Sequence, residues 1–152
     1  MTSVTPFLWF NTNLAEPIAY YASVFPSMDV LERSEGPEGT IFGAQIELFG
    51  QRLMLLNGGP AHAGFKESFS LLVTVSEQHE IDSLWSRLTA DGGEEGQCGW
   101  LKDRYGLSWQ IVPDCLSALI GGPDPLRAKQ ALDAMLGMGR LSIDELRAAY
   151  DS

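Results

Sequence analysis

The order of predicted elements repeats once along the chain, and this repeat limits the possible folds more than any single motif does. In the first half, the apolar segment 4–10 predicts a buried strand. Leu14, Ile18 and Phe25 then lie on one face of a helix, which Pro26 ends. Asn13 and Glu16 have the spacing of a capping box at the start of that helix. Three further strands are predicted, at 28–33, 40–49 and 52–56.

The second half follows the same order of elements. A strand is predicted at 69–75, and an apolar stripe over 81–88 predicts a helix that Ser76 caps. Strands at 95–102 and 107–112 complete this half. Two similar modules, each with a strand, a helix and further strands, predict an α+β fold.

After Pro113 the pattern becomes helical. Asp124 is typical of an N-cap and Pro125 of a first helical position, and Ser142 with Glu145 forms a second capping-box pattern. We expect this tail to pack on the sheet or on a second subunit. The chain is therefore predicted to be a single domain over 1–152, with modules at about 1–60 and 66–115 and a helical tail at 116–152.

Charge and composition exclude several classes of partner. The formal charge of −10 at pH 7 disfavours binding to nucleic acid or to an anionic membrane surface. No apolar run approaches the roughly 20 residues needed to cross a bilayer, and segment 1–10 has no charged region of the kind found in a signal peptide. Cys98 and Cys115 form neither a CxxC motif nor a disulfide framework, so we expect a cytoplasmic protein.

Three segments resemble a known family: Thr5–Phe10, Leu56–Pro60 and, most specifically, Gly96–Pro113. They are similar to the PhnB-like proteins of the glyoxalase/bleomycin-resistance/dioxygenase superfamily, also called vicinal oxygen chelate proteins, which are often labelled 3-demethylubiquinone-9 3-methyltransferase-like. The resemblance extends over nearly the whole chain, including the helical tail. It implies two βαβββ modules that form an incomplete barrel around a cavity. It also implies a homodimer, in some members with modules exchanged between chains.

The resemblance also identifies where a metal would bind. In the metal-dependent members, His and Glu side chains at four inward-facing strand positions hold one divalent ion. By motif, these positions fall at Pro6, Leu53, Ser70 and Gln110. Their neighbours offer no ligand either: Phe7, Met54 and Phe69. A neutral amide is a poor ligand, so the resemblance implies neither a metal nor another cofactor here.

Aromatic residues are concentrated on the predicted strands, with a few polar residues among them. Apolar walls with a few polar anchors are typical of small-molecule sites, although aromatic residues on strands are equally typical of a core. The candidate ligand-binding residues are Trp9, Asn57, Ser70, Trp100, Lys102 and Gln110. If Gln110 faces the cavity, strand alternation predicts that Trp109 packs on the opposite side, beneath a helix or the tail.

Two further side chains, those of His62 and Cys98, are of types that can take part in catalysis. His62, in the Gly59–Gly64 loop, is either an exposed loop residue or a general acid or base at the cavity mouth. Cys98 lies in a glycine-rich stretch, which indicates a close backbone approach, and we interpret its thiol as packed and unreactive.

The leading functional prediction is a small-molecule-binding protein with a degenerate metal site and no assigned catalytic residue. One alternative is an enzyme of the same superfamily, such as a lyase, isomerase or dioxygenase with displaced ligands, or the methyltransferase of the family label. Methyl transfer gains no support from the glycines, because neither Gly58–Gly59 nor Gly92–Gly93 lies in a strand–turn–helix context. The other alternative is a purely sequestering protein, similar to the bleomycin-binding relatives.

Overall fold

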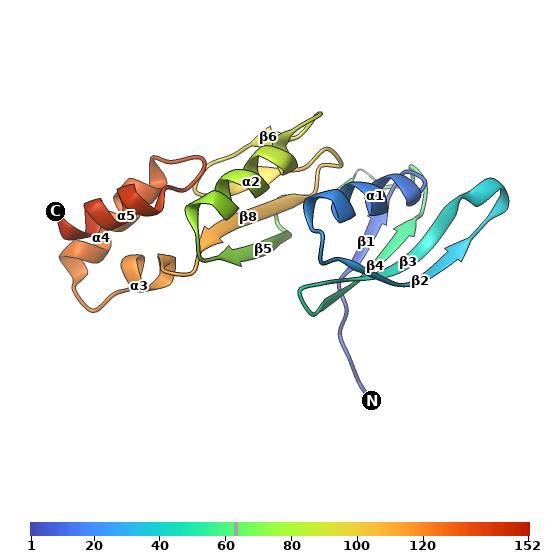
Figure 1. Cartoon of the computed structure of the whole chain (residues 1–152), viewed down its shortest axis with the longest axis horizontal. Helices are drawn as coiled ribbons and strands as arrows, with labels where there is room; N and C mark the ends of the chain where they lie inside the picture. Colours follow the sequence, from blue (N-terminus) through green and yellow to red (C-terminus); the bar gives the residue numbers. More distant parts are fainter. Residues whose placement is uncertain (63) are drawn as a thin grey trace. The chain divides into compact units, whose positions relative to one another are not determined.

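The computed structural model describes residues 1–62 and 64–152. The chain divides into two compact units, Met1–Gly64 and Phe65–Ser152, and the helical tail belongs to the second. Each unit contains one four-stranded sheet that does not close into a barrel (Figure 1). The predicted α+β class is therefore confirmed. Within the described residues, no helix has the length and apolar character needed to cross a membrane.

The first unit has one helix and four strands. Its elements are β1 (Phe7–Phe10), α1 (Ala15–Val24), β2 (Asp29–Glu35), the short 3-10 helix η1 (Pro37–Gly39), β3 (Ile41–Leu48) and β4 (Gln51–Asn57). The sheet order is β1-β4-β3-β2, with β1 parallel to β4 and the other neighbours antiparallel. The four predicted strands and the helix are all present, with small shifts at their ends.

Alternation along the strands separates a buried face from an open one. Leu8, Phe10 and Leu55 are almost fully buried, and the Phe10 ring lies 6.3 Å from the Tyr21 ring of α1. The buried face of the sheet is thus the one that α1 covers. Phe7 and Met54 are paired on the other face, which is partly exposed.

The predicted capping box at the start of α1 is wrong. The side-chain oxygen of Asn13 accepts hydrogen bonds from the amides of Ala15 (3.1 Å) and Ile41 (3.0 Å), so it joins the helix start to β3. The carboxylate of Glu16 accepts from the Thr12 hydroxyl instead (2.9 Å). Asn13 is therefore positioned by a contact that lies 28 residues away in sequence, which local spacing does not reveal.

The second unit repeats this arrangement and adds three helices. Its elements are β5 (Ser70–Val75), α2 (Gln78–Thr89), β6 (Glu94–Glu95), β7 (Trp100–Lys102), β8 (Ser108–Pro113), α3 (Leu116–Ile120), α4 (Pro125–Leu136) and α5 (Ile143–Asp151). The sheet order is β5-β8-β7-β6, with β5 parallel to β8. Glu77, rather than Ser76, is the N-cap of α2, where it forms a capping box with Glu80.

The single strand predicted at 95–102 is two short strands, β6 and β7, joined by a turn. The backbone of Cys98 has φ +58° and that of Gly99 has φ +84°, so the chain cannot stay extended there. The Cys98 amide donates to the carbonyl of Met138, and the Gly99 amide to that of Gly139, each at 2.8 Å. The close backbone approach expected at Cys98 is thus a contact with the tail.

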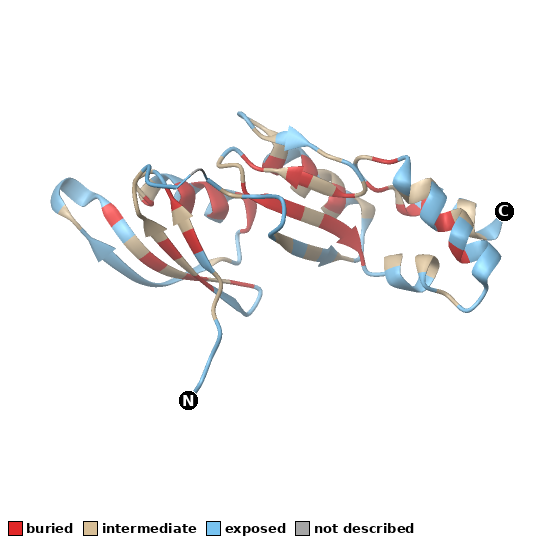
Figure 2. Ribbon diagram, turned by 180° about the vertical axis from the view of Figure 1, so that it is seen from behind, coloured by how far each residue is buried: buried red, intermediate tan, exposed pale blue. Residues whose placement is uncertain are grey.

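Helix α2 packs against β7 and β8, and buried residues gather in α2 and β8 (Figure 2). Trp109 is only 2% exposed, and its indole N–H donates to the carboxylate of the buried Asp103 (2.9 Å). Gln110 has the opposite orientation and is partly exposed. The prediction that Trp109 packs away from Gln110 is confirmed.

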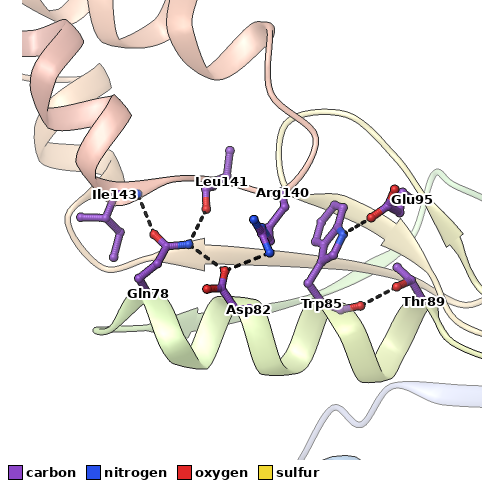
Figure 3. Close-up of polar contacts among 8 residues, drawn as sticks. All are labelled: Gln78, Asp82, Trp85, Thr89, Glu95, Arg140, Leu141 and Ile143. Carbon is purple, nitrogen blue, oxygen red and sulfur yellow. Dashed lines mark hydrogen bonds and ion pairs between the residues drawn. The ribbon is translucent and has the colours of Figure 1, made fainter.

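The tail is attached to the end of β8 and to the start of α2. Val112 forms an apolar cluster with Met138, Leu141 and Leu146. The Gln78 side chain donates to the Leu141 carbonyl (3.0 Å) and accepts from the Ile143 amide (2.8 Å), as Figure 3 shows. The tail therefore packs on its own unit.

Both predicted tail caps are present as side-chain acceptors. Asp124 accepts from the amides of Leu126 and Arg127 at the start of α4. The Ser142 hydroxyl accepts from the Glu145 amide at the start of α5 (3.3 Å).

Candidate functional site

Four of the six predicted ligand-binding residues lie on one face of the second sheet. Trp100 is paired with Gln110, and Lys102 is paired with Ser108, which in turn is paired with Ser70. Paired residues on neighbouring strands project from the same side of a sheet. This side is opposite to Leu101 and Trp109, which are buried on the side of the sheet that α2 covers.

Gln110 and Ser70 are in direct contact. The side-chain amide of Gln110 donates a hydrogen bond to the Ser70 hydroxyl, at 3.0 Å. Both side chains are partly buried, and the bond fixes them in the middle of the open face. They can offer further hydrogen bonds to a molecule lying there.

A cavity of about 420 Å³ opens beside β6 and β7. Its lining combines acidic residues, one cation, an indole and a hydroxyl: Glu67, Glu94, Glu95, Gly96, Gln97, Trp100, Leu101, Lys102 and Ser108. Of the predicted ligand-binding residues, Trp100 and Lys102 are in this lining. The cavity lies entirely within the second unit.

Lys102 forms an ion pair within the cavity lining. Its ammonium lies 2.6 Å from a carboxylate oxygen of Glu67, in the loop before β5. The hydrogen bond with Lys102 lowers the pKa of the Glu67 carboxyl, and the same bond raises the pKa of the Lys102 ammonium, with a smaller contribution from the charge of Glu94. Both groups therefore stay charged across the neutral pH range.

Ser108 forms part of the cavity wall and is only 1% exposed. Its hydroxyl has no hydrogen-bond partner among residues 1–62 and 64–152. Buried polar groups are normally paired, so an unpaired hydroxyl beside a cavity is unusual. A bound molecule that reaches it can supply the missing hydrogen bond.

The wall formed by β6 is held by α2 and the tail. The Trp85 indole donates to the Glu95 carboxylate at 2.6 Å (Figure 3). Beyond Glu95, the turn at Gly96–Gly99 is bonded to the loop before α5 through Cys98 and Gly99. Backbone hydrogen bonds thus join the cavity wall to the tail.

The sequence prediction missed most of the lining residues, among them the three glutamates and Ser108. Ser108 lies two residues before Gln110, so strand alternation carried a usable signal for it. Glu67 lies in a loop, where no periodicity indicates direction. The positions of Glu94 and Glu95 beside the cavity follow from the break between β6 and β7, which was not predicted.

The first unit holds the other two predicted residues. The Trp9 indole donates to the Gly59 carbonyl (2.9 Å), and its ring meets the ring of the exposed His62 at 4.5 Å between centroids. Asn57 is paired with Phe10, so alternation places it on the α1 side of the sheet, away from Trp9. A ligand role for either residue stays a prediction, as does an acid–base role for His62.

The positions expected to hold a metal need one correction. Leu53 is 2% exposed, on the α1 side of its sheet, so the inferred register in the first unit was wrong by one residue. Phe7 and Met54 occupy the open face there, while Ser70 and Gln110 occupy it in the second unit. A phenyl ring, a thioether, a hydroxyl and an amide do not fit a hard divalent ion. Among residues 1–62 and 64–152, no three His, Cys, Asp or Glu side chains are grouped so that they could bind one.

Comparison with known proteins gives both a family and a fold. Residues 2–112 match the 3-demethylubiquinone-9 3-methyltransferase family. A PhnB protein from Bacillus cereus that carries this methyltransferase name is 29% identical, with a TM-score of 0.66, over 74% of this chain and 99% of its own. No curated protein matches the chain.

Two more distant structures share the fold alone. Protein PA1353 from Pseudomonas aeruginosa is 22% identical, with a TM-score of 0.59, over 75% of this chain and 100% of its own. The fosfomycin resistance protein FosX from Listeria monocytogenes, solved with Mn(II) and sulfate, is 12% identical, with a TM-score of 0.53, over 72% of this chain and 87% of its own.

The family match stops at residue 112, so the expectation that the resemblance includes the helical tail is wrong. Before that point the match covers all of the first unit and the second unit through most of β8. Together with the two mixed four-stranded sheets, this places the chain, without its tail, in the PhnB-like 3-demethylubiquinone-9 3-methyltransferase family, with the vicinal oxygen chelate fold.

Proposed function

We propose that the chain binds a small organic molecule on the open face of the second sheet, and that it does so without a metal ion. The observation that carries this proposal is the cavity lined by Trp100, Lys102 and Ser108. Its volume of about 420 Å³ lies in the range of small-molecule sites, which are roughly 300–1,000 Å³. Its lining combines an indole wall with a few polar groups, as such sites do.

The residues beside the cavity extend this site along the sheet. Gln110 and Ser70 continue the open face from Trp100 toward β5. Leu72, which is paired with Gln110, is 54% exposed and offers apolar surface there. A ligand in the cavity can thus extend along this face and contact both hydrogen-bonding and apolar groups.

Metal chemistry is not part of the proposal. The side chains at the expected ligand positions, Phe7, Met54, Ser70 and Gln110, do not fit a divalent ion. Elemental analysis of the purified protein is expected to show no stoichiometric zinc, nickel, iron or manganese. About one tightly held ion per chain, lost in Gln110→Ala, would contradict this.

Methyl transfer, which the family name suggests, has no support from the geometry. S-adenosylmethionine is usually held at a glycine-rich turn between a first strand and a helix. Here the β1–α1 connection is Asn11–Leu14 and the β5–α2 connection is Ser76–Glu77, neither of which contains glycine. We therefore propose binding rather than methyl transfer.

We also propose that the protein is a cytoplasmic homodimer. Phe7 is more than half exposed on the open face of the first sheet, and apolar surface of this kind favours a partner. Both cysteines are free, as expected in a reducing compartment. Light scattering should return a dimer at micromolar concentration, whereas a monomer would count against this.

The binding proposal is tested by soaking crystals of the full chain with a library of small aromatic and polar compounds. Bound compounds are expected in the cavity, against Trp100 and Lys102. Trp100→Leu should abolish most of these positions, while Phe42→Ala, an exposed aromatic of the first unit, should change none. A library that leaves this cavity empty would overturn the proposal.

A further inference from the structure

The charge of the cavity lining constrains which molecules fit it. Three lining residues are glutamates, Glu67, Glu94 and Glu95, and only Lys102 is cationic. The Lys102 ammonium contacts Glu67 at 2.6 Å and lies opposite Glu94 across β6 and β7. The Glu95 carboxylate is turned to the α2 side, where it accepts from Trp85, so one ammonium lies between the carboxylates of Glu67 and Glu94. This leaves the open-face lining negative at neutral pH. An anionic ligand is therefore repelled and a cationic one attracted.

An independent observation comes from Ser108. Its hydroxyl is buried in the cavity wall and has no hydrogen-bond partner among the described residues. A hydroxyl that has lost its water without gaining a partner is unfavourable, so it is satisfied best when a ligand brings a hydrogen bond. Since the hydroxyl oxygen has free lone pairs, an N–H donor is a suitable partner.

The third observation concerns the indole of Trp100, which is partly exposed in the same lining. The face of an indole attracts cations and also packs against apolar or aromatic groups. A metal ion has no apolar body to pack on the ring, and within the described residues no group of three metal-binding side chains exists. An organic cation uses both properties of the indole.

We propose that this cavity binds an organic ammonium ion whose N–H donates to the Ser108 hydroxyl. The carboxylate of Glu94, which is on the same face as Lys102, neutralises its charge, and its apolar body packs on Trp100. The inference rests on the proposed small-molecule function and adds the class of ligand.

The test compares three probes of similar shape and different charge on the full-length protein. These are 2-phenylethylammonium, 2-phenylethanol and 3-phenylpropanoate, and binding is followed by NMR through the indole N–H signal of Trp100, assigned with Trp100→Phe. The ammonium probe should shift this signal saturably and bind about tenfold tighter than the neutral probe. The carboxylate probe should bind least, and added salt should weaken the binding of the ammonium probe.

Two variants separate the contributions. Ser108→Ala should weaken binding of the ammonium probe about five- to tenfold without lowering the melting temperature of the free protein, because its hydroxyl is unpaired there. Glu94→Gln should weaken that binding about two- to fivefold. Glu32→Gln, which removes the same charge from exposed strand β2 of the first unit, is the matched control and should have no effect.

The outcomes distinguish this inference from the proposed function. If the neutral or carboxylate probe binds the cavity as tightly as the ammonium probe, the ligand class is wrong and the small-molecule site remains. If Ser108→Ala leaves binding unchanged, the assigned hydrogen bond is wrong. If neither the probes nor any library compound occupies the cavity, both proposals fail.

Discussion

The two units are built on the same plan and differ mainly on the open faces of their sheets. In both, a first strand lies parallel to the last long strand, and a helix covers one face. Leu55 in the first unit and Trp109 in the second occupy equivalent, almost fully buried positions. On the open faces, by contrast, Phe7 and Met54 in the first unit correspond to Ser70 and Ser108 in the second.

This difference shows that the scaffold and the site are specified by different residues. The buried faces are apolar in both units, because each must pack beneath a helix. The open faces do not pack beneath a helix, so their residues can be polar. In the second unit, Lys102 and the hydrogen-bonded side chains of Ser70 and Gln110 lie on this face. The second unit also carries the tail, which is bonded to the turn beside the cavity.

The largest expected effect comes from removing the equivalent core residues. Trp109→Ala should lower the free energy of unfolding by about 3–5 kcal/mol, and Leu55→Ala by about 2–5 kcal/mol. Trp109→Ala also leaves the Asp103 carboxylate without the indole donor. Urea unfolding measures both losses, with Phe42→Ala, an exposed residue, expected to lie within about 0.5 kcal/mol of the wild type. A loss below 1 kcal/mol at either core position would show that the two cores are not equivalent.

A second variant disturbs the open face of the first unit alone. A Cβ added at Gly58 would lie 2.1 Å from the Trp9 ring, so Gly58→Ala must displace the indole. We expect a loss of about 1–3 kcal/mol in unfolding free energy and a shifted Trp9 indole signal in NMR spectra. Gly43→Ala in β3 is the control, since its Cβ would meet atoms no closer than 3.8 Å. Equal effects of the two substitutions would argue against the close packing of Trp9.

The tail contact, which has no counterpart in the first unit, is tested at Gln78. Gln78→Ala removes the hydrogen bonds to the Leu141 carbonyl and the Ile143 amide, and should cost about 1–2 kcal/mol. Amide hydrogen exchange at Ile143 should accelerate, while exchange in the first unit stays unchanged. His79→Ala, an exposed neighbour on α2, should leave Ile143 protected. Unchanged exchange at Ile143 in Gln78→Ala would mean that the apolar cluster alone holds the tail.

The smallest effect concerns the ion pair of the cavity. Because the pKa of Glu67 is lowered, its carboxylate contributes to stability at pH values above the ordinary pKa of glutamate. This contribution is lost as the pH falls through the lowered value. Because the pKa of Lys102 is raised, its ammonium contributes to stability at pH values below the ordinary pKa of lysine. This contribution is lost as the pH rises through the raised value. In an NMR titration, Lys102→Met should raise the pKa of the Glu67 carboxyl toward its ordinary value. A Glu67 pKa that is the same in both proteins would show that the pair does not persist in solution.

The sequence allowed the direction of the side chains to be predicted more accurately in the second sheet than in the first, although the strands themselves were predicted better in the first. In Ser108–Ile111 a large aromatic and a polar amide are adjacent, so alternation predicted which side each occupies. In Leu53–Leu56 every residue is apolar, which gives no alternation, and the register there was wrong by one residue. The break between β6 and β7 was missed because it depends on a left-handed backbone at Cys98 and on bonds to the distant tail.

The candidate site was predictable only where it lies on strands. Trp100, Lys102 and Gln110 share a face through strand spacing, and the structure places them together. The glutamates of the cavity come from a loop and from a two-residue strand, where spacing does not indicate direction. The unpaired state of Ser108 is a property of its packed surroundings and has no sequence signal.

The indole N–H signals test most directly whether the open face of the second unit is the binding face. The chain has four tryptophans, and one NMR spectrum reports on the open face of each unit through Trp9 and Trp100, and on the buried side of the second unit through Trp85 and Trp109. During titration with a mixture of small cationic, neutral and anionic aromatic compounds, the Trp100 signal should shift saturably, while those of Trp85 and Trp109 stay in place. A Trp100 signal that does not move while that of Trp9 does would contradict the account.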